Sequence, residues 1–431
     1  MGHRAIRNFE SLAENELRLD ALAIAEAGYA AINVGAALIR KLHIENGELH
    51  INDARYRLES RRVFFIGVGK CAIAAAETVE RLLGEHLAGG IALDVAPSEH
   101  PALTKIETII GTHPLPSAAN EDATKRIISL LSGCTEDDLV LMLISGGGST
   151  LLCLTEAPTT CADESVLFTS LTARGASIQE INTVRKHTSY ARGGGLAQAA
   201  FPAEVISLIV SDVPDNDIGF IASGPTVRDT STIADARAIL KRYDILPSEE
   251  FEFLETPKDQ KYFDQVDTIL FLTNQDALFA MKEEAGQRGY AATIMDDRVQ
   301  GESAQIGRAL VETLHSTPPK SVLLYAGEST VTTGGHSGAG GRNQEMALSA
   351  LESIRPGELL LPLASDGHDN TDHAGAIADA TTRAHADARN LSIKEHLDAH
   401  CSYDFFKASG DAVSTGYTGS NVSDFIIAIK D

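Results

Sequence analysis

The sequence has few cysteines, few basic residues and no long apolar run, and each shortage excludes a class of protein. The 431 residues include five cysteines, an odd number, with no C-x-x-C pair. A disulfide-stapled domain would need paired cysteines, so we expect free thiols in a reducing compartment. No apolar run reaches the roughly 18 residues of a membrane span, and the charged N-terminus lacks the apolar stretch of a signal peptide. We therefore expect a soluble, cytoplasmic protein.

Positive charge is also scarce. The 36 Lys and Arg residues are outnumbered by 60 Asp and Glu residues, which gives a formal net charge of −24. This balance argues against nucleic acid or an anionic membrane as a partner. A small anionic substrate remains compatible with it, because a local cluster of cations can reverse the field inside a site. The length is enough for about two or three domains with cores of their own.

Short apolar segments alternate with helical patterns along most of the chain. A helical region over 10–42 comes first. The predicted strands are 63–66, 91–95, 108–111, 139–144, 205–210, 268–272, 291–295, 321–325 and 359–363. Such alternation indicates an α/β fold with a mainly parallel sheet. Because residues 243–267 are polar and lack a pattern, we place a boundary there. The predicted domains are 1–245 and 246–431, with 416–431 packing back on the first domain as an open alternative.

The first strand is followed by Gly67, Gly69 and Lys70, and active sites of α/β folds lie at such strand ends. This loop is not a Walker A motif, but it matches G-x-G-x-x-A through Ala72. Asp94 lies near where a dinucleotide fold places its ribose-binding carboxylate. A lysine in the first turn of a helix opposes the helix dipole, which favours an anionic partner there. The loop alone leaves a dinucleotide, a transferable phosphoryl group and a plain packing turn open.

Two further strands end in polar loops. Ser145-Gly146-Gly147-Gly148-Ser149 follows strand 139–144 and has the composition of an anion-binding nest, the alternative being a flexible turn. Asp212 follows strand 205–210, where a carboxylate suits Mg²⁺ binding or deprotonation of a hydroxyl. Arg185 and Lys186 form a basic pair on a predicted helix, either for a ligand or as a solvated face.

The second half of the chain repeats the pattern of a glycine loop and a cation. Strand 321–325 leads to Glu328 and then to the loop 334–341, after which Arg342 opens a helix. A guanidinium at that position suits a bidentate clamp on phosphate. The acidic and histidine-rich segment 365–373 follows another strand and could hold a metal, whereas we expect His396 and His400 to lie on a solvated helix face. Two such loops with strand-end carboxylates are typical of phosphoryl transfer.

These segments resemble the glycerate 2-kinases of the MOFRL family, which genome annotation often names hydroxypyruvate reductases. The matching stretches are GVGK (67–70), THPLP (112–116), ISGGGS (144–149), EINTVRKH (180–187), VSDVP (210–214), ASGPTV (222–227), GGRNQE (340–345), SDG (365–367) and TGSNVSD (418–424). They occur in family order over nearly the whole chain.

The resemblance implies a Rossmann-like N-terminal domain, a smaller MOFRL-type α/β domain, and a site in the cleft between them. It implies an ATP- and Mg²⁺-dependent kinase acting on the 2-hydroxyl of D-glycerate. Lys70, Asp212 and Arg342 match the catalytic group, with Asp212 also the expected metal ligand. The expected substrate and nucleotide contacts are Gly67, Gly69, Ser145, Gly146, Gly147, Gly148, Ser149, Asn182, Arg185, Lys186, Glu328, Gly341, Asn343, Asp366 and Asn421.

Four places depart from the family pattern, namely 193–195, Asp215, 335–341 and 366–372. They leave a related sugar acid open as the substrate. Two other functions also stay open: an NAD(P)H-dependent hydroxypyruvate reductase with His113 as proton donor, and a binding protein without turnover. The expected partner is a small molecule, and the oligomeric state is open between a monomer and a homodimer.

Overall fold

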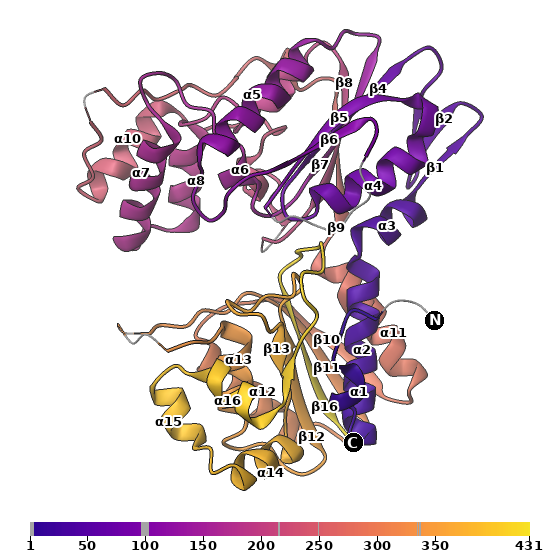
Figure 1. The fold of residues 1–431 in the computed structure, drawn as a ribbon, viewed down its shortest axis with the longest axis vertical. Helices are drawn as coiled ribbons and strands as arrows, with labels where there is room; N and C mark the ends of the chain where they lie inside the picture. Colours follow the sequence, from indigo (N-terminus) through magenta and orange to yellow (C-terminus); the bar gives the residue numbers. More distant parts are fainter. Residues whose placement is uncertain (1–3, 96–102, 214–215, 249, 334, 336–337) are drawn as a thin grey trace. The chain divides into compact units, whose positions relative to one another are not determined.

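The chain folds into two compact units, described here from a computed structural model (Figure 1). The structure describes residues 4–95, 103–213, 216–248, 250–333, 335 and 338–431. The parallel-sheet unit is Val34–Phe271, and the mixed-sheet unit combines Met1–Asn33 with Leu272–Asp431. This division differs from the predicted domains in two respects. The N-terminal helices belong with the C-terminal half, and the chain changes unit after Phe271 rather than after residue 245.

The parallel-sheet unit alternates strands and helices, as the apolar pattern predicts. In chain order it contains α3 (Val34–Lys41), β1 (Leu42–Glu45), β2 (Glu48–Ile51), β3 (Ala54–Arg57), β4 (Arg62–Val68), α4 (Ala72–Leu83), η1 (Gly84–His86), β5 (Leu87–Asp94), β6 (Ile106–Ile110), α5 (Ala118–Ser132), β7 (Asp138–Ile144), α6 (Gly148–Leu151), α7 (Cys161–Ala173), α8 (Ile178–Lys186), α9 (Gly195–Ala200), β8 (Glu204–Val210), η3 (Ile221–Ser223), α10 (Ile233–Arg242), η4 (Gln260–Tyr262) and β9 (Val266–Leu272). The strands predicted over 63–66, 139–144 and 205–210 are confirmed as β4, β7 and β8.

The main sheet of this unit has six strands in the order β6-β5-β4-β7-β8-β9. The pairs β4–β5, β4–β7, β5–β6 and β7–β8 are parallel, which confirms the predicted sheet type. Ile66 and Met142 pack with Ile127 of α5 on one face. α4 covers the other face, where a side chain at Gly67 would meet Ala72. Figure 1 shows α4 and α5 on opposite sides of the sheet, so its faces are both buried, as parallel sheets require.

A small antiparallel sheet of three strands, β1-β2-β3, precedes β4. The sequence patterns did not predict it. Leu49, Ile51 and Tyr56 are buried on one of its faces, whereas His43 and Glu45 alternate with them in direction and are exposed. This alternation is the signature of a sheet with one packed and one solvated face.

The mixed-sheet unit contains the remaining elements. In chain order these are α1 (Phe9–Leu12), α2 (Glu16–Ile32), α11 (Asn274–Gln287), β10 (Ala291–Val299), α12 (Ser303–Ser316), β11 (Ser321–Gly327), α13 (Arg342–Ala350), β12 (Glu358–Leu363), β13 (Gly375–Ala376), β14 (Ala378–Asp379), α14 (Ala380–Ala388), α15 (Ile393–Asp398), α16 (Ser402–Ser409), β15 (Ala412–Val413) and β16 (Asp424–Lys430). The strands predicted over 291–295, 321–325 and 359–363 are confirmed as β10, β11 and β12.

Its sheet has seven strands, six of them in the order β10-β11-β16-β12-β13-β15, with β14 pairing β12. The last strand, β16, lies between β11 and β12 and is antiparallel to both. The segment 416–431 thus ends as a central strand of this sheet instead of packing on the first predicted domain. α2 packs on α11 and β12, and Tyr29 of α2 makes an edge-to-face contact with Phe425 of β16, 5.0 Å between ring centroids. These contacts explain why the N-terminal helices belong to this unit.

The cysteines depart from the prediction in one pair. Cys153 and Cys161 form a disulfide, with their Cα atoms 6.2 Å apart. Cys71, Cys134 and Cys401 are free, as expected. The chain turns back between the end of α6 and the start of α7, which brings together two cysteines whose spacing suggests no motif.

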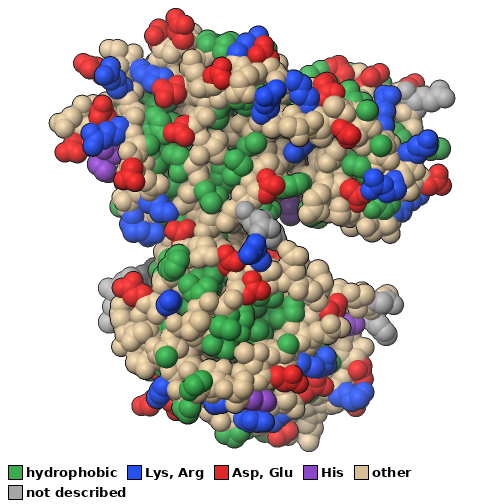
Figure 2. All heavy atoms as spheres, turned by 180° about the vertical axis from the view of Figure 1, so that it is seen from behind, with side chains coloured by type: hydrophobic (Ala, Val, Ile, Leu, Met, Phe, Trp, Pro, Cys, Tyr) green, Lys and Arg blue, Asp and Glu red, His purple; other side chains and the backbone are tan. Residues whose placement is uncertain are grey.

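No single described helix is both long enough and apolar enough to cross a membrane. The helices α2 and α3, which meet at a bend, reach the required length and apolar composition only when they are taken together. Figure 2 shows acidic and basic side chains interspersed over the visible face of each unit.

Candidate active site

The carboxyl ends of β4, β7 and β8 meet along one edge of the parallel sheet. The chain runs outward from β4 to β5 and β6, and then returns to the other side of β4 with β7. The point where the strand order reverses lies between β4 and β7, and open α/β sheets bind ligands there. The predicted loops 67–70 and 145–149 follow these two strands, and Asp212 follows β8. The sheet therefore brings together three groups that lie far apart in sequence.

The loops after β4 and β7 interlock. The N–H of Lys70 donates to the carbonyl of Gly146 (3.0 Å), and the N–H of Ser145 donates to the carbonyl of Val68 (2.9 Å). Gly69 has a φ of +118°, and a Cβ at this position would lie 2.1 Å from the hydroxyl oxygen of Ser145. Only glycine fits such a contact. Gly69 is thus required for the fit between the loops, as Gly67 is for packing α4 on β4.

The second loop presents its backbone beside Lys70. A Cβ at Gly147, where φ is +85°, would lie 3.4 Å from Cγ of Lys70 and 3.6 Å from Cδ2 of His113. No described residue accepts a hydrogen bond from the N–H of Gly146, Gly147 or Ser149. Backbone N–H groups that have no acceptor among the described residues, next to a lysine, suit an anion even in an acidic protein. The nest predicted from the sequence has the geometry to bind one.

The hydroxyl of Ser149 belongs to a short chain of polar groups. It lies 2.8 Å from the hydroxyl of Ser223, which donates to Oδ1 of Asn182 on α8 (2.7 Å). Ser223 has a φ of +60° and is fully buried. These bonds fix the orientation of Ser149 and connect the loop to α8. Ser223 was not among the predicted site residues, although the motif ASGPTV contains it.

Asp212, which follows β8, is one of the charges that act on Cys71 at the start of α4. Burial raises the pKa of the Cys71 thiol, at the start of α4, to about 12. The hydrogen bond with Ser145 opposes this shift, whereas the negative charges of Asp94 and Asp212 add to it. The carboxylate of Asp212 thus lies close enough to the first turn of α4 to affect a buried group there. The neighbouring Asp215 lies outside the described residues.

Arg185 and Lys186 have contacts within the protein. The Lys186 ammonium lies 3.1 Å from a carboxylate oxygen of Asp229. The Arg185 guanidinium stacks over the ring of Phe168, 3.8 Å from its centroid. Burial and the nearby Arg192 lower the pKa of Arg185 to about 10. The structure gives both cations packing roles, and their contact with a ligand stays a prediction.

Arg342 opens α13 in the mixed-sheet unit and is clamped by two carboxylates. Its Nη1 lies 3.0 Å from Glu328, and its Nε and Nη2 lie 2.5 Å and 3.0 Å from the two oxygens of Asp424. Burial alone would lower the pKa of Arg342, but Asp424 and Glu328 raise it overall. Glu328 follows β11 and Asp424 begins β16, and these strands pair in register with Gly327 opposite Asp424. Strand pairing therefore places both acids.

The N-terminus of α13 is occupied by a carboxylate of the protein. Asp369, which is 3% exposed, accepts from the N–H groups of Asn343 (3.0 Å) and Gln344 (2.8 Å). A Cβ at Gly341 would lie 2.1 Å from the carbonyl oxygen of Asp369. The first turn of this helix is therefore capped from within, and the phosphate contact expected of the Arg342 guanidinium stays a prediction. Gly341 is needed for the approach of Asp369.

Burial raises the pKa of Asp369 to about 6, with a smaller contribution from Asp424, while hydrogen bonds from Asn343 and Gln344 oppose the shift. Two other predicted residues lie at the same edge of the mixed sheet. Asp366 accepts from the N–H of His368 (3.0 Å), and Asn421 accepts from Ser365 (3.5 Å). Because β11 and β12 are both antiparallel to β16, their carboxyl ends meet its amino end.

A pocket of about 330 Å³ lies within the mixed-sheet unit beside Arg342. Its walls include the backbone of Gly340 and the pair Glu345–His400, whose nearest atoms are 3.0 Å apart. Burial raises the pKa of Glu345, and His400 opposes that shift. The predicted placement of His400 on a solvated helix face is wrong, because His400 follows α15 in a turn with φ of +52° and faces the pocket.

The carboxylate that favoured a dinucleotide has another role. Asp94 is 3% exposed and accepts from the N–H of Ile73 (3.1 Å) and of Val95 (2.7 Å). It caps the first turn of α4 rather than facing a ribose. The glycine loop 67–70 therefore lacks the acidic partner that the dinucleotide interpretation assigned to it.

The described residues contain two groups with the spacing of metal ligands: Glu14, His385 and Asp411, and His43, Glu45 and His50. In the first group, Asp411 is already paired with the buried Arg18 (2.8 Å). Neither group includes Asp212 or the segment 365–373, so the metal role of Asp212 stays a prediction.

A parallel α/β sheet whose reversal point carries a lysine and an open glycine loop is typical of enzymes that handle phosphorylated ligands. Residues 20–255 match a domain of unknown function, DUF4147, and residues 321–424 match the MOFRL family.

Related proteins match this chain over both of these domains. A D-glycerate 2-kinase of Thermotoga maritima is 34% identical, covering 86% of this chain and 92% of its own. A protein of Agrobacterium vitis with a provisional hydroxypyruvate reductase name is 37% identical, in a match that covers 84% of this chain and 86% of that protein. The crystal structure of a glycerate kinase from Thermotoga maritima superimposes with a TM-score of 0.84 at 30% identity, covering 96% of this chain and 99% of that one. The chain belongs to the MOFRL-type glycerate kinase family.

Proposed function

We propose that the protein is a glycerate 2-kinase, which transfers the γ-phosphoryl group of ATP to the 2-hydroxyl of D-glycerate and releases ADP and 2-phosphoglycerate. The observation that carries this function is the position of Lys70 at the reversal point of the parallel sheet, beside the backbone N–H groups of Gly146, Gly147 and Ser149, for which no described residue is an acceptor. The relatives named as glycerate kinases from bacteria, archaea and mammals support the same activity.

In the proposed reaction, the glycerate hydroxyl oxygen attacks the γ-phosphorus while the bond to ADP breaks. Lys70 and the loop 146–149 bind anionic oxygens and stabilise the charge that the phosphoryl group carries during transfer. Asp212 orients the attacking hydroxyl and accepts its proton. Mg²⁺, with Asp212 as its protein ligand, would neutralise the charge on the phosphates when bound.

Arg342 contributes a further positive charge in this proposal. Three of its donor contacts go to Glu328 and Asp424, and its side chain is 31% exposed. A guanidinium has five N–H donors, so two of them make no contact with a described residue and can donate to phosphoryl or carboxylate oxygens. The two acids fix the direction in which these donors point, which lowers the entropy lost on binding. Glu328 and Asp424 are then positioning residues.

The test is an assay of ADP release on the purified full chain with D-glycerate, ATP and Mg²⁺, beside an assay of NADH oxidation with hydroxypyruvate. We expect ADP release that depends on glycerate, and no NADH oxidation. NADH oxidation without ADP release would establish the reductase instead. A panel of small sugar acids in the ADP assay decides whether glycerate or a related acid is the substrate. A cytoplasmic location and a homodimer stay predictions.

A further inference from the structure

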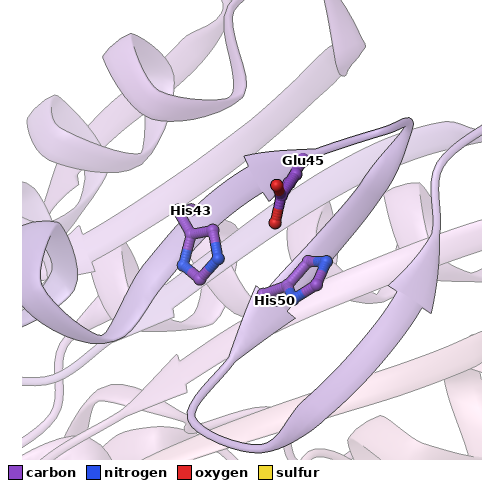
Figure 3. A group of neighbouring side chains, drawn as sticks. All are labelled: His43, Glu45 and His50. Carbon is purple, nitrogen blue, oxygen red and sulfur yellow. The ribbon is translucent and has the colours of Figure 1, made fainter.

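The β1–β2 hairpin carries two histidines and a glutamate on its exposed face (Figure 3). The strands pair so that His43 lies opposite His50, and Glu45 lies opposite Glu48. In an antiparallel pair, opposite residues point to the same side. All four side chains therefore lie on one face, while Leu49 and Ile51 are buried on the other. The packed face fixes the direction of the polar one.

The ligand atoms on this face are close together. One ligand atom each of His43, Glu45 and His50 lies within 4.8 Å of the other two. The two imidazole rings are stacked, with their centroids 4.7 Å apart and their planes 28° apart. The nearest carboxylate oxygen of Glu48 is 3.9 Å from Nε2 of His50. Figure 3 shows the three labelled side chains turned toward one another from neighbouring strands.

The donor set selects the class of ion. Imidazole nitrogen with carboxylate oxygen suits Zn²⁺ and its neighbours in the first transition row, whereas Mg²⁺ and Ca²⁺ prefer oxygen ligands alone. With bonds of about 2.0–2.1 Å, two ligands of a tetrahedral ion lie about 3.3 Å apart. Small rotations of surface side chains are enough to reach that spacing from the present one.

We propose that His43, Glu45 and His50 bind a divalent transition-metal ion such as Zn²⁺, with Glu48 available as a fourth ligand. This site is separate from the kinase residues and from the Mg²⁺ that the proposed reaction uses. Arg55 and Arg57 of β3 lie opposite His50 and Glu48 in the register. Their charges oppose the ion, so we expect binding in the micromolar range.

The ion would cross-link β1 and β2 and stabilise the small sheet. A ligand that binds only the folded state raises stability by mass action. β3 leads through a short turn into β4, whose carboxyl end carries Lys70. We expect a shift to higher melting temperature with Zn²⁺ and no change in phosphoryl transfer.

The experiment uses the full chain without a polyhistidine tag, freed of metal by a chelator and dialysed. Isothermal titration with ZnCl₂ should give one ion per chain, and Co²⁺ should give a visible absorption band typical of nitrogen and oxygen ligands. His43→Gln and His50→Gln should each lower the affinity for Zn²⁺ by about tenfold or more, and the double variant should abolish binding. Circular dichroism checks that each variant is folded.

Two histidine variants serve as controls. His86→Gln changes an exposed histidine of η1 in the same unit, and His385→Gln removes a member of the other candidate group. Both should keep the affinity for Zn²⁺ and the Co²⁺ band. The proposal is overturned if the full chain binds no Zn²⁺ in the micromolar range, if binding survives in the double variant, or if His385→Gln removes it.

Discussion

The two glycine loops that precede a cation at a helix N-terminus differ in what surrounds the cation. Lys70 lies beside a second loop in which the N–H groups of Gly146, Gly147 and Ser149 have no acceptor among the described residues. Arg342 is held by two carboxylates, and the N–H groups that follow it in α13 are bound by Asp369. A glycine loop with a cation is therefore not by itself an anion site. The two loops are distinguished by whether an acceptor within the protein binds their backbone N–H groups.

The largest effect is expected for Lys70. Lys70→Ala should lower kcat of the glycerate-dependent ADP release by about 10³-fold or more, because a charge that stabilises the transferring group is lost. Stability in urea should change little. Lys125→Ala, which removes an exposed lysine from α5, is the matched control and should keep full activity. A fully active Lys70→Ala variant would remove Lys70 from the mechanism.

Arg342 should differ from Lys70 by affecting stability as well as activity. Arg342→Ala leaves the carboxylate of Asp424, whose side chain is 5% exposed, without its partner. Breaking a buried ion pair in this way typically costs about 3–5 kcal/mol, which urea unfolding measures. The double variant R342A/D424N should recover part of the stability and none of the activity. Loss of activity alone would show that the clamp is not structural.

The role of Asp369 at the N-terminus of α13 can be tested through the pH dependence of stability. Its pKa is raised from 3.8 in the unfolded chain to about 6 in the folded one. Between these values the unfolded state releases the proton first, so stability falls as pH rises, by about 3 kcal/mol at most at about 1.4 kcal/mol per pKa unit. Urea unfolding between about pH 4 and pH 6 should show this decline in the native protein, and Asp369→Asn should reduce it. Burial also raises the pKa of Asp424 to about 6, so Asp424 should maintain the remaining decline.

Asp372 is the control for this pH dependence. A hydrogen bond from Tyr403 lowers the pKa of Asp372 below its ordinary value of 3.8. The stability that the ionised Asp372 carboxylate contributes is therefore lost only as the pH falls through this lowered pKa. Asp372→Asn should leave the decline between about pH 4 and pH 6 unchanged. If Asp369→Asn retains the whole decline, Asp369 does not contribute to it.

The smallest effect is expected for a backbone change in the open loop. Gly147→Ala places a side chain where φ is +85° and where its Cβ meets Lys70 and His113. We expect a loss of about 1 kcal/mol in stability and a raised KM for the anionic substrate. Gly175→Ala has a φ of +75° with nothing within 4 Å of the added Cβ. It should lose similar stability with unchanged KM, and equal KM values for both variants would exclude the loop as a binding site.

Local patterns predicted the elements well, because a strand or helix is specified by neighbouring residues. The predicted strand 139–144 is β7, Asp138–Ile144, and the predicted strand 321–325 is β11, Ser321–Gly327. The exceptions depend on tertiary packing. The helical region 10–42 divides into α2 and α3 at Asn33, which is the last residue of the mixed-sheet unit before the chain enters the parallel-sheet unit.

The arrangement of the candidate site was predicted in part. Lys70, Asp212 and the loop 145–149 were expected at one edge because strand ends of a parallel sheet converge, and their roles stay predictions. Asp94 was considered as a ribose ligand and the segment 365–373, which contains Asp369, as a metal site, but both carboxylates cap helices from within the protein. Nothing near residue 342 in the sequence shows that an acid at 369 occupies the N-terminus of the next helix. Such pairings are decided by long-range contacts, which no local pattern contains.

The sequence by itself determined the alternation of strands and helices, the acidic net charge and the order of the motifs, because each follows from composition or from neighbouring side chains. Only the tertiary structure decided that β16 enters the sheet between β11 and β12, that Arg342 is clamped by Glu328 and Asp424, and that two histidines face each other on the β1–β2 hairpin. Each of these depends on strand register, which pairs residues according to how the whole chain packs.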